Sequence, residues 1–323
     1  MKKLFVMTLA ATAMLASCSS DDTMEVPQSK SAITFASFIN KSVRATDATL
    51  DNLGSISVYG WRDADCIFNK QIVQIVNVGT NGTGTYTPVQ YWQAGHTYSF
   101  EAVAPTSVDG ASFTAKSTGG SFNYTNNASI DLLYAKAADV TTASPLTDKP
   151  GAVHFTFKHL LSRVMFTFNN TFAATDAAKI TISNVKITNA YVNGTITPAA
   201  DGAAWVVSNN TLQVAFDEAA TDALKDLAAN TGKGATTPMY LIPATSPSYN
   251  VEFDVTLNQN GVTTTYHHTA TINTTMDMGM SYNFVANINA SNVDPDNELF
   301  RIEFTAEVEK WDPDVTITVD TAE

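Results

Sequence analysis

The chain is poor in cysteine and in basic residues, and each shortage excludes some classes of fold, binding site or partner. Its 323 residues include two cysteines, which excludes a disulfide framework and a cysteine-rich metal site. Lys and Arg number 18 against 31 Asp and Glu, a net charge of −13, so no nucleic-acid partner is expected. Charged residues make up 15% and hydrophobic residues 44%, which predicts folded domains with a core.

The sequence also lacks any arrangement typical of a catalytic or metal site. No G-x-S-x-G, Walker-type or H-E-x-x-H motif occurs. His267 and His268 are adjacent on an expected strand, so their side chains point to opposite faces and cannot share a metal ion. His154 and His159 bracket a strand end without a carboxylate or a thiol at ligand spacing. We therefore expect structural histidines, no metal, no cofactor and no enzymatic activity.

The first 17 residues are expected to be a signal peptide. Lys2 and Lys3 precede an apolar stretch, residues 4–14, which is too short to span a bilayer as a stable helix. The sequence LASC at 15–18 then matches the lipobox of bacterial lipoproteins, in which the thiol, here of Cys18, is acylated. Acylation would anchor the protein to a membrane, with the polar residues 18–30 as a flexible tether. A buried N-terminal helix ending in an incidental cysteine is the alternative.

After residue 30 the sequence predicts an all-β fold. Thr, Asn, Val and aromatic residues recur in short alternating runs separated by turn residues, which is typical of antiparallel β-sandwiches. The clearest runs are residues 56–59, 98–103, 153–157, 164–168, 180–182, 251–255 and 282–285. The turn signals between runs are Asn81-Gly82, Gly119-Gly120, Asn193-Gly194 and Asn260-Gly261. Residues 217–230 have helical composition, and one short helix is expected there.

The length is about twice the ~150-residue prior for one domain, so two domains are expected. Residues 141–151 contain two prolines and few apolar side chains. We place the boundary there, with an N-terminal β-sandwich over 31–150 and a C-terminal β-sandwich over 151–323. Cys66 lies beside Ile67 and Phe68, and a buried structural thiol is expected at this position.

The first of two notable terminal segments, residues 31–44, is predicted to be a removable strand. Its apolar side chains are Ile33, Phe35 and Phe38, and a polar link containing Arg44 and Ala45 follows. An arginine in an exposed polar link suits the cleft of a trypsin-like protease, which would cut between Arg44 and Ala45. An ordinary surface arginine in a strand connection is the alternative.

The second terminal segment, residues 300–319, is predicted to be a donor of strands. Its two halves alternate apolar and polar side chains with period two, so each half can bury one face. A strand at a chain end fills a groove, either its own or that of a neighbouring subunit. The apolar side chains that would enter such a groove are Phe300, Ile302, Phe304, Val308, Val315, Ile317 and Val319.

Besides the lipobox, a set of short segments occurs in order along the chain: ITFA at 33–36, VRAT at 43–46, ISVYG at 56–60, FKHLLSRV at 157–164, MYLIPA at 239–244, GMSYNF at 279–284 and IEFTAEVEKW at 302–311. In these segments, and across nearly its full length, the chain resembles the fimbrillin family, the type V pilins and accessory fimbrial subunits of anaerobic Gram-negative bacteria. The resemblance implies two transthyretin-like β-sandwich domains and export as an outer-membrane lipoprotein at the cell surface. It also implies cleavage after Arg44 by an arginine-specific, trypsin-like protease. The lost strand would then be replaced by residues 300–319 of another fimbrial subunit, which builds a fimbria that supports adhesion.

Three other interpretations remain open. A monomeric surface lipoprotein that binds glycans would need exposed, roughly coplanar aromatic side chains, and Trp61, Trp92, Trp205 and Trp311 are the candidates. A stable monomeric lipoprotein would keep its first strand permanently. An enzyme would need a clustered polar pocket.

Overall fold

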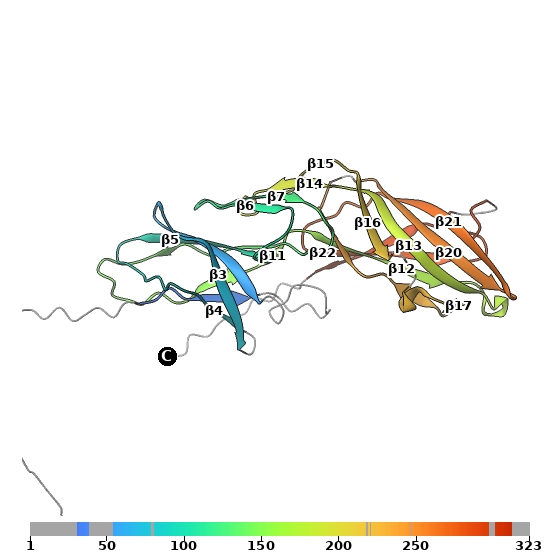
Figure 1. Ribbon diagram of the computed structural model, residues 1–323, viewed down its shortest axis with the longest axis horizontal. Helices are drawn as coiled ribbons and strands as arrows, with labels where there is room; N and C mark the ends of the chain where they lie inside the picture. Colours follow the sequence, from blue (N-terminus) through green and yellow to red (C-terminus); the bar gives the residue numbers. More distant parts are fainter. Residues whose placement is uncertain are drawn as a thin grey trace, which may run out of the picture.

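The computed structural model describes residues 31–38, 54–78, 81–217, 219, 221–245, 247–296 and 301–311. These residues form four β-sheets and two single-turn 3-10 helices, which confirms the all-β prediction. Most strands of the first half of the chain and most strands of the second half lie toward opposite ends of an elongated molecule, with a small sheet between them (Figure 1). In the described ranges, no helix has both the length and the hydrophobicity needed to span a bilayer.

The N-terminal half is a nine-stranded sheet in the order β10-β1-β4-β3-β2-β5-β8-β11, with β9 paired to β5. Its core is aromatic, with Phe35, Phe68, Tyr98, Phe100 and Phe155 all buried. The strands are β1 (Phe35–Phe38), β2 (Ser55–Arg62), β3 (Asp65–Val78), β4 (Asn81–Thr85), β5 (Thr97–Ala104), β8 (Leu133–Lys136), β9 (Val140–Thr141), β10 (Val153–Thr156) and β11 (Lys158–His159). Because β10 and β11 follow residue 150, this sheet includes residues beyond the domain boundary that the sequence analysis places there. The position of that boundary stays a prediction.

The C-terminal half is a β-sandwich of two five-stranded sheets. One has the order β18-β12-β22-β23 with β19 paired to β12, and the other has the order β16-β13-β20-β21 with β17 paired to β13. Alternate side chains of both sheets meet in one core, as period-two patterning predicts. The strands are β12 (Ser162–Asn170), β13 (Lys179–Ala190), β16 (Leu212–Asp217), β17 (Leu227–Ala228), β18 (Lys233–Ala235), β19 (Met239–Leu241), β20 (Tyr249–Gln259), β21 (Val262–Ile272), β22 (Met280–Ile288) and β23 (Phe304–Lys310).

A four-stranded sheet joins the two halves. Its order is β15-β14-β7-β6, where β6 (Ala111–Thr114) and β7 (Ser121–Thr125) come from the first half of the chain. The other two strands, β14 (Asn193–Ile196) and β15 (Val206–Ser208), come from the second half. Beneath them a third core cluster combines side chains of both halves. The two halves therefore share both backbone pairing and buried surface.

The seven alternating runs predicted between residues 56 and 285 all contain strands, but two of the predicted turns are not turns. Asn260 and Gly261 do form the two-residue turn between β20 and β21, with φ angles of 53° and 80°. Asn193-Gly194 instead begins β14, and Asn81-Gly82 begins β4. Gly194 is needed for packing, since a Cβ there would lie 2.7 Å from the Trp205 ring.

The expected helix over residues 217–230 is reduced to one 3-10 turn, Asp222–Leu224, followed by β17. Leu224 and Leu227 are both buried in the C-terminal core, and Asp226 between them has a φ angle of 50°, which an α-helix does not allow. The other 3-10 helix is Ala174–Asp176. Pairing of β17 with β13 satisfies the backbone in place of helical bonds.

Cys66 is exposed, so the prediction of a buried thiol is wrong. It lies near the start of β3, directly after the β2–β3 hairpin turn, and its thiol donates to the Phe68 carbonyl at 3.3 Å. Phe68, two residues further on, enters the aromatic core. Regular alternation would place Cys66 and Phe68 on one face, but the register of β3 against β2 shifts between them, where Gly60 pairs with Phe68 and Trp61 with Cys66. The apolar neighbours therefore indicated a nearby core, but not this irregularity in the strand.

Candidate functional site

The predicted removable strand is an interior strand of the N-terminal sheet. β1 pairs with β4 in antiparallel register, with Phe35 opposite Gly84, and with β10 in parallel register, with Phe35 opposite Val153. Phe38 lies at the end of β1, opposite Thr156. Both edges of β1 are therefore occupied by neighbours that belong to the rest of the sheet.

Backbone bonds continue this pairing upstream of β1. The Ile33 N–H donates to the Gln90 carbonyl at 2.9 Å, and the Trp92 N–H donates to the Ser31 carbonyl at 2.9 Å. The Tyr86 hydroxyl donates to the Ile33 carbonyl at 2.8 Å. Residues 31–38 are thus held along their whole described length by residues that are distant in sequence.

Phe35 is the central side chain of the groove that β1 fills. It is 1% exposed, and its ring lies 5.4 Å from Phe68, 5.8 Å from Phe100, 5.8 Å from Phe155 and 5.3 Å from Tyr86. Ring pairs at these separations add to the energy of burial. Ile33 is also 1% exposed. Ile33 and Phe35, two of the three apolar side chains of this segment that were predicted for strand exchange, are therefore fully packed.

Gly84 allows β4 to approach β1 closely. A Cβ at this position would lie 2.5 Å from Cγ1 of Val73 and 3.2 Å from Cβ of Phe35. These separations are shorter than van der Waals contact, so the groove would have to widen. Gly84 and the parallel neighbour β10 are parts of the groove that sequence reasoning missed. The NGTGT run of β4 was a usable signal for the glycine, whereas nothing local connects β10 to β1.

The described residues in the first half of the predicted donor segment pack against the same subunit. Ile302 is 5% exposed, and the Phe304 ring lies 5.2 Å from Phe166 and 5.8 Å from Phe253 in the C-terminal core. Within the described residues β23 pairs with β22 alone, so it is an edge strand. Val308 is 49% exposed near the end of this strand.

Several predicted site residues lie outside the described residues. They are the lipidation residue Cys18, the processing residues Arg44 and Ala45, and the strand-exchange residues Phe300, Val315, Ile317 and Val319. Their roles stay predictions.

Trp311 fixes the end of the described chain at the junction of the two halves. Its ring stacks on His159 at 4.0 Å and on Tyr240 at 5.3 Å, and its own exposure is 6%. His159 in turn is hydrogen-bonded to the buried Asp131 carboxyl group, with 2.9 Å between Nδ1 and Oδ2. His159, Tyr240 and Trp311 lie in segments that carry the family resemblance, but nothing local in the sequence shows that they meet, because the members of this cluster come from four separate segments.

The two adjacent histidines lie on opposite faces of β21, as the sequence predicts. His267 faces solvent and bonds Asp254 at 2.8 Å, while His268 is buried with Nε2 at 3.0 Å from the Val293 carbonyl, so the pair does point to opposite faces. Burial acts to raise the pKa of Asp254, but hydrogen bonds from Asn184 and His267 outweigh it and hold that pKa below its usual range. No group of three or more metal-ligating side chains occurs in the part of the chain that the structure describes.

The tryptophans do not form an exposed platform for glycans. Trp92, Trp205 and Trp311 are 4%, 8% and 6% exposed. The Trp205 indole donates to the Leu160 carbonyl at 2.6 Å, which fixes it within the junction core. Only Trp61 is partly exposed among the four. Stacking on a sugar needs an open ring face, so these side chains support packing roles.

The sequence profile of a family described as fimbrillin-like matches residues 43–311. The chain belongs to this family. A candidate cell adhesion protein from Bacteroides uniformis is 18% identical with a TM-score of 0.51, over 88% of this chain and 99% of that one. A second, from Bacteroides ovatus, is 15% identical with a TM-score of 0.51, over 89% and 100%. At these identities the likeness shows the fold, and no curated protein matches the chain.

Membership of the fimbrillin-like family confirms the resemblance found in the sequence. It supports a fimbrial subunit at the cell surface that associates with other fimbrial subunits.

Proposed function

We propose that this fimbrillin-like protein is a structural subunit of a bacterial surface fimbria that supports adhesion. It would be exported as an outer-membrane lipoprotein through Cys18, cut between Arg44 and Ala45 by a trypsin-like protease, and joined to its neighbours by strand exchange. The observation that carries the proposal is the position of β1, an interior strand of the N-terminal sheet close to the predicted cleavage site.

Loss of an interior strand creates a specific acceptor. Without β1, the facing edges of β4 and β10 would each present unpaired N–H and C=O groups, and the Phe68, Phe100 and Phe155 rings would lose their contact with Phe35. A donor strand regains about 1.5–3 kcal/mol for each large apolar side chain buried. Each ladder hydrogen bond contributes about 1 kcal/mol more. Such a head-to-tail contact does not close on itself and generates a filament.

The packing of β23 favours the second half of the predicted donor segment. Ile302 and Phe304 help to close the subunit's own C-terminal core, so donating them would open that core. Val315, Ile317 and Val319 follow Trp311, the last described residue, and keep the alternating pattern that a groove requires. We therefore expect these three side chains to enter the groove of the next subunit.

The test is limited digestion of the full chain with an arginine-specific protease, followed by N-terminal sequencing and size-exclusion chromatography. The wild-type protein is expected to give a new N-terminus at Ala45 and to form oligomers, because the vacated groove accepts a neighbour's strand. Arg44→Gln should stay uncut at this bond and monomeric, and the matched control Arg62→Gln should behave as wild type. Two results would contradict the proposal. One is protein that has been cut between Arg44 and Ala45 and stays monomeric at high concentration, and the other is cleavage only at other bonds.

A further inference from the structure

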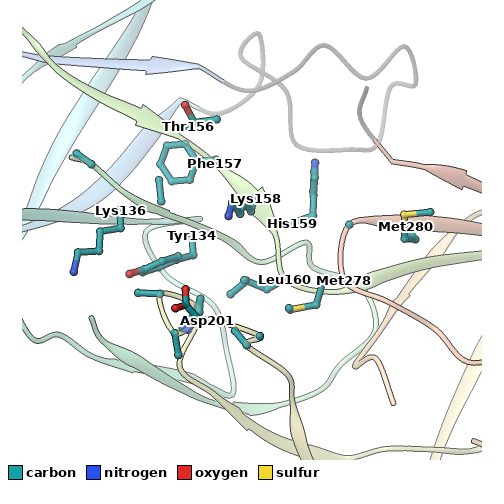
Figure 2. A pocket seen from close by; sticks show the side chains of 18 of the residues that line it. Tyr134, Lys136, Thr156, Phe157, Lys158, His159, Leu160, Asp201, Met278 and Met280 are labelled. Atoms are coloured by element: carbon teal, nitrogen blue, oxygen red, sulfur yellow. The ribbon is translucent and has the colours of Figure 1, made fainter. Parts of the chain in front are cut away.

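A cavity of about 870 Å³ lies at the junction of the two halves, and the proposed assembly makes no use of it. It is lined by residues of β8, by residues 156–160, by the loop 198–203 and by residues 278–280. Figure 2 shows Lys136 and Lys158 on neighbouring strands, with Met278 and Met280 across the space from Lys136. The cavity is large enough for several residues of an extended segment.

The charge of the cavity is opposite to that of the protein. Lys136, Lys158 and Lys310 line it against a single carboxylate, Asp201, in a chain whose net charge is −13. Lys136 donates to the Ser117 carbonyl at 3.4 Å, and an ammonium group has three N–H donors, so further donors remain on that side chain. The cavity therefore favours an anionic occupant.

The described chain ends in the wall of the same cavity. The Trp311 N–H donates to the Gly279 carbonyl at 2.8 Å, and the Trp311 ring stacks on His159. Gly279 and His159 both line the cavity, as does Lys310. Because Trp311 is held by its backbone and by its ring, the residues after it begin beside the cavity.

Those residues have the composition that the cavity favours. Residues 312–323 carry Asp312, Asp314, Asp320 and Glu323 and no lysine or arginine. Their apolar members, Val315, Ile317 and Val319, match the apolar part of the lining, which includes Phe157, Leu160, Met278 and Met280. Fully extended, the segment spans at most roughly 40 Å, which exceeds what is needed to cross the cavity.

We propose that the acidic segment 312–323 docks into the lysine-lined cavity of its own subunit. Attachment at Trp311 gives the segment an effective concentration of roughly millimolar, so weak charge pairing is sufficient to fill the cavity in the same chain. If the proposed function holds, the docked segment has to leave the cavity before it can enter a neighbour's groove.

The test is carbodiimide cross-linking of the full chain at low concentration, as an equal mixture of ¹⁴N- and ¹⁵N-labelled protein, read by mass spectrometry. Cross-links are expected between Lys136 or Lys158 and carboxylates of residues 312–323, within one isotopic form. Their yield should fall as NaCl is raised, because salt screens exposed charges. Cross-links that join the two isotopic forms would show instead that a second copy supplies the segment.

Charge reversal separates docking from mere proximity. Lys136→Glu should lower the yield of cross-links from Lys158 to residues 312–323 several-fold, although Lys158 itself is unchanged. Lys225→Glu, at an exposed lysine of the C-terminal half, is the matched control and should leave the yield unchanged. An unchanged Lys158 yield in Lys136→Glu would overturn the proposal. Because the readout is a contact within an uncut monomer, failure of assembly after trimming would leave this result intact.

Discussion

The strands nearest the two ends of the described chain are built in opposite ways. β1 is an interior strand with a neighbour on each edge, and its Phe35 is 1% exposed among four aromatic rings. β23 pairs with β22 alone among the described residues, and its Val308 is 49% exposed. Both strands have alternating sequences, so the difference comes from where each one lies in its sheet.

The contrast bears on which strand the proposed exchange would replace. Removing an edge strand leaves one new edge, and edges of this kind are common in folded proteins. Removing an interior strand leaves two facing edges and an open core, which only another strand of similar pattern can fill. In the proposed assembly we therefore expect the groove of β1 to be the acceptor, because loss of β23 would leave only one open edge.

The largest expected effect is the difference between two matched Phe→Ala substitutions. Phe35→Ala should lower the free energy of unfolding by about 3–5 kcal/mol, because it empties a fully packed site. Phe304→Ala should cost about half as much, since Phe304 is partly exposed at a sheet edge. Urea denaturation measures the free energy of unfolding of both variants. Equal losses in the two would show that the interior strand is not packed more tightly than the edge strand.

A smaller effect is expected from closing the space between β1 and β4. Gly84→Ala places a methyl group against Val73 and Phe35 and should lower the free energy of unfolding by about 1–3 kcal/mol. Gly151→Ala is the matched control, because nothing lies within 4 Å of a Cβ there, and it should be nearly neutral. Thermal unfolding of the wild type and of both variants gives the two changes in stability. A neutral Gly84→Ala would mean that the groove is looser than its contacts indicate.

The smallest effect concerns the hydroxyl that holds the start of β1. Tyr86→Phe removes the bond to the Ile33 carbonyl and should cost about 1 kcal/mol at neutral pH. Burial raises the pKa of Tyr86 above its usual value near 10. The phenol therefore stabilises the fold fully below pH 10, and this contribution is lost as pH rises through the raised pKa.

Stability curves of wild type and Tyr86→Phe should therefore converge above pH 10. Urea midpoints measured from pH 8 to pH 12 check this expectation. A gap between the two proteins that stays constant over this range would show that the hydroxyl does not anchor β1.

The period-two alternation of apolar and polar residues was sufficient to locate the strands, but not to predict which strands pair with each other. The runs at 56–59, 98–103 and 251–255 lie within β2, β5 and β20. Cys66, by contrast, has apolar neighbours and is still exposed. Alternation tells which residues share a face, whereas the sheet to which that face belongs depends on the rest of the fold.

The helical composition of residues 217–230 was outweighed by tertiary contacts. Leu224 and Leu227 are needed in the C-terminal core, and pairing of Leu227 with Ile180 gives the backbone its bonds. Helix propensity amounts to a few tenths of a kcal/mol per residue, less than the burial of one leucine. Local composition was therefore a weaker guide here than the position of the apolar side chains.

By itself the sequence determined the all-β class, the family, the apolar side chains of the first strand, and the acidic segment after Trp311, because these follow from composition and from short-range order. Only the tertiary structure decided that β1 is interior, that β10 lies beside it in parallel, and that three lysines from separate segments line one cavity. The reason is physical. Pairing between strands and the meeting of distant side chains depend on how the whole chain buries its apolar surface, and no stretch of a few residues contains that information.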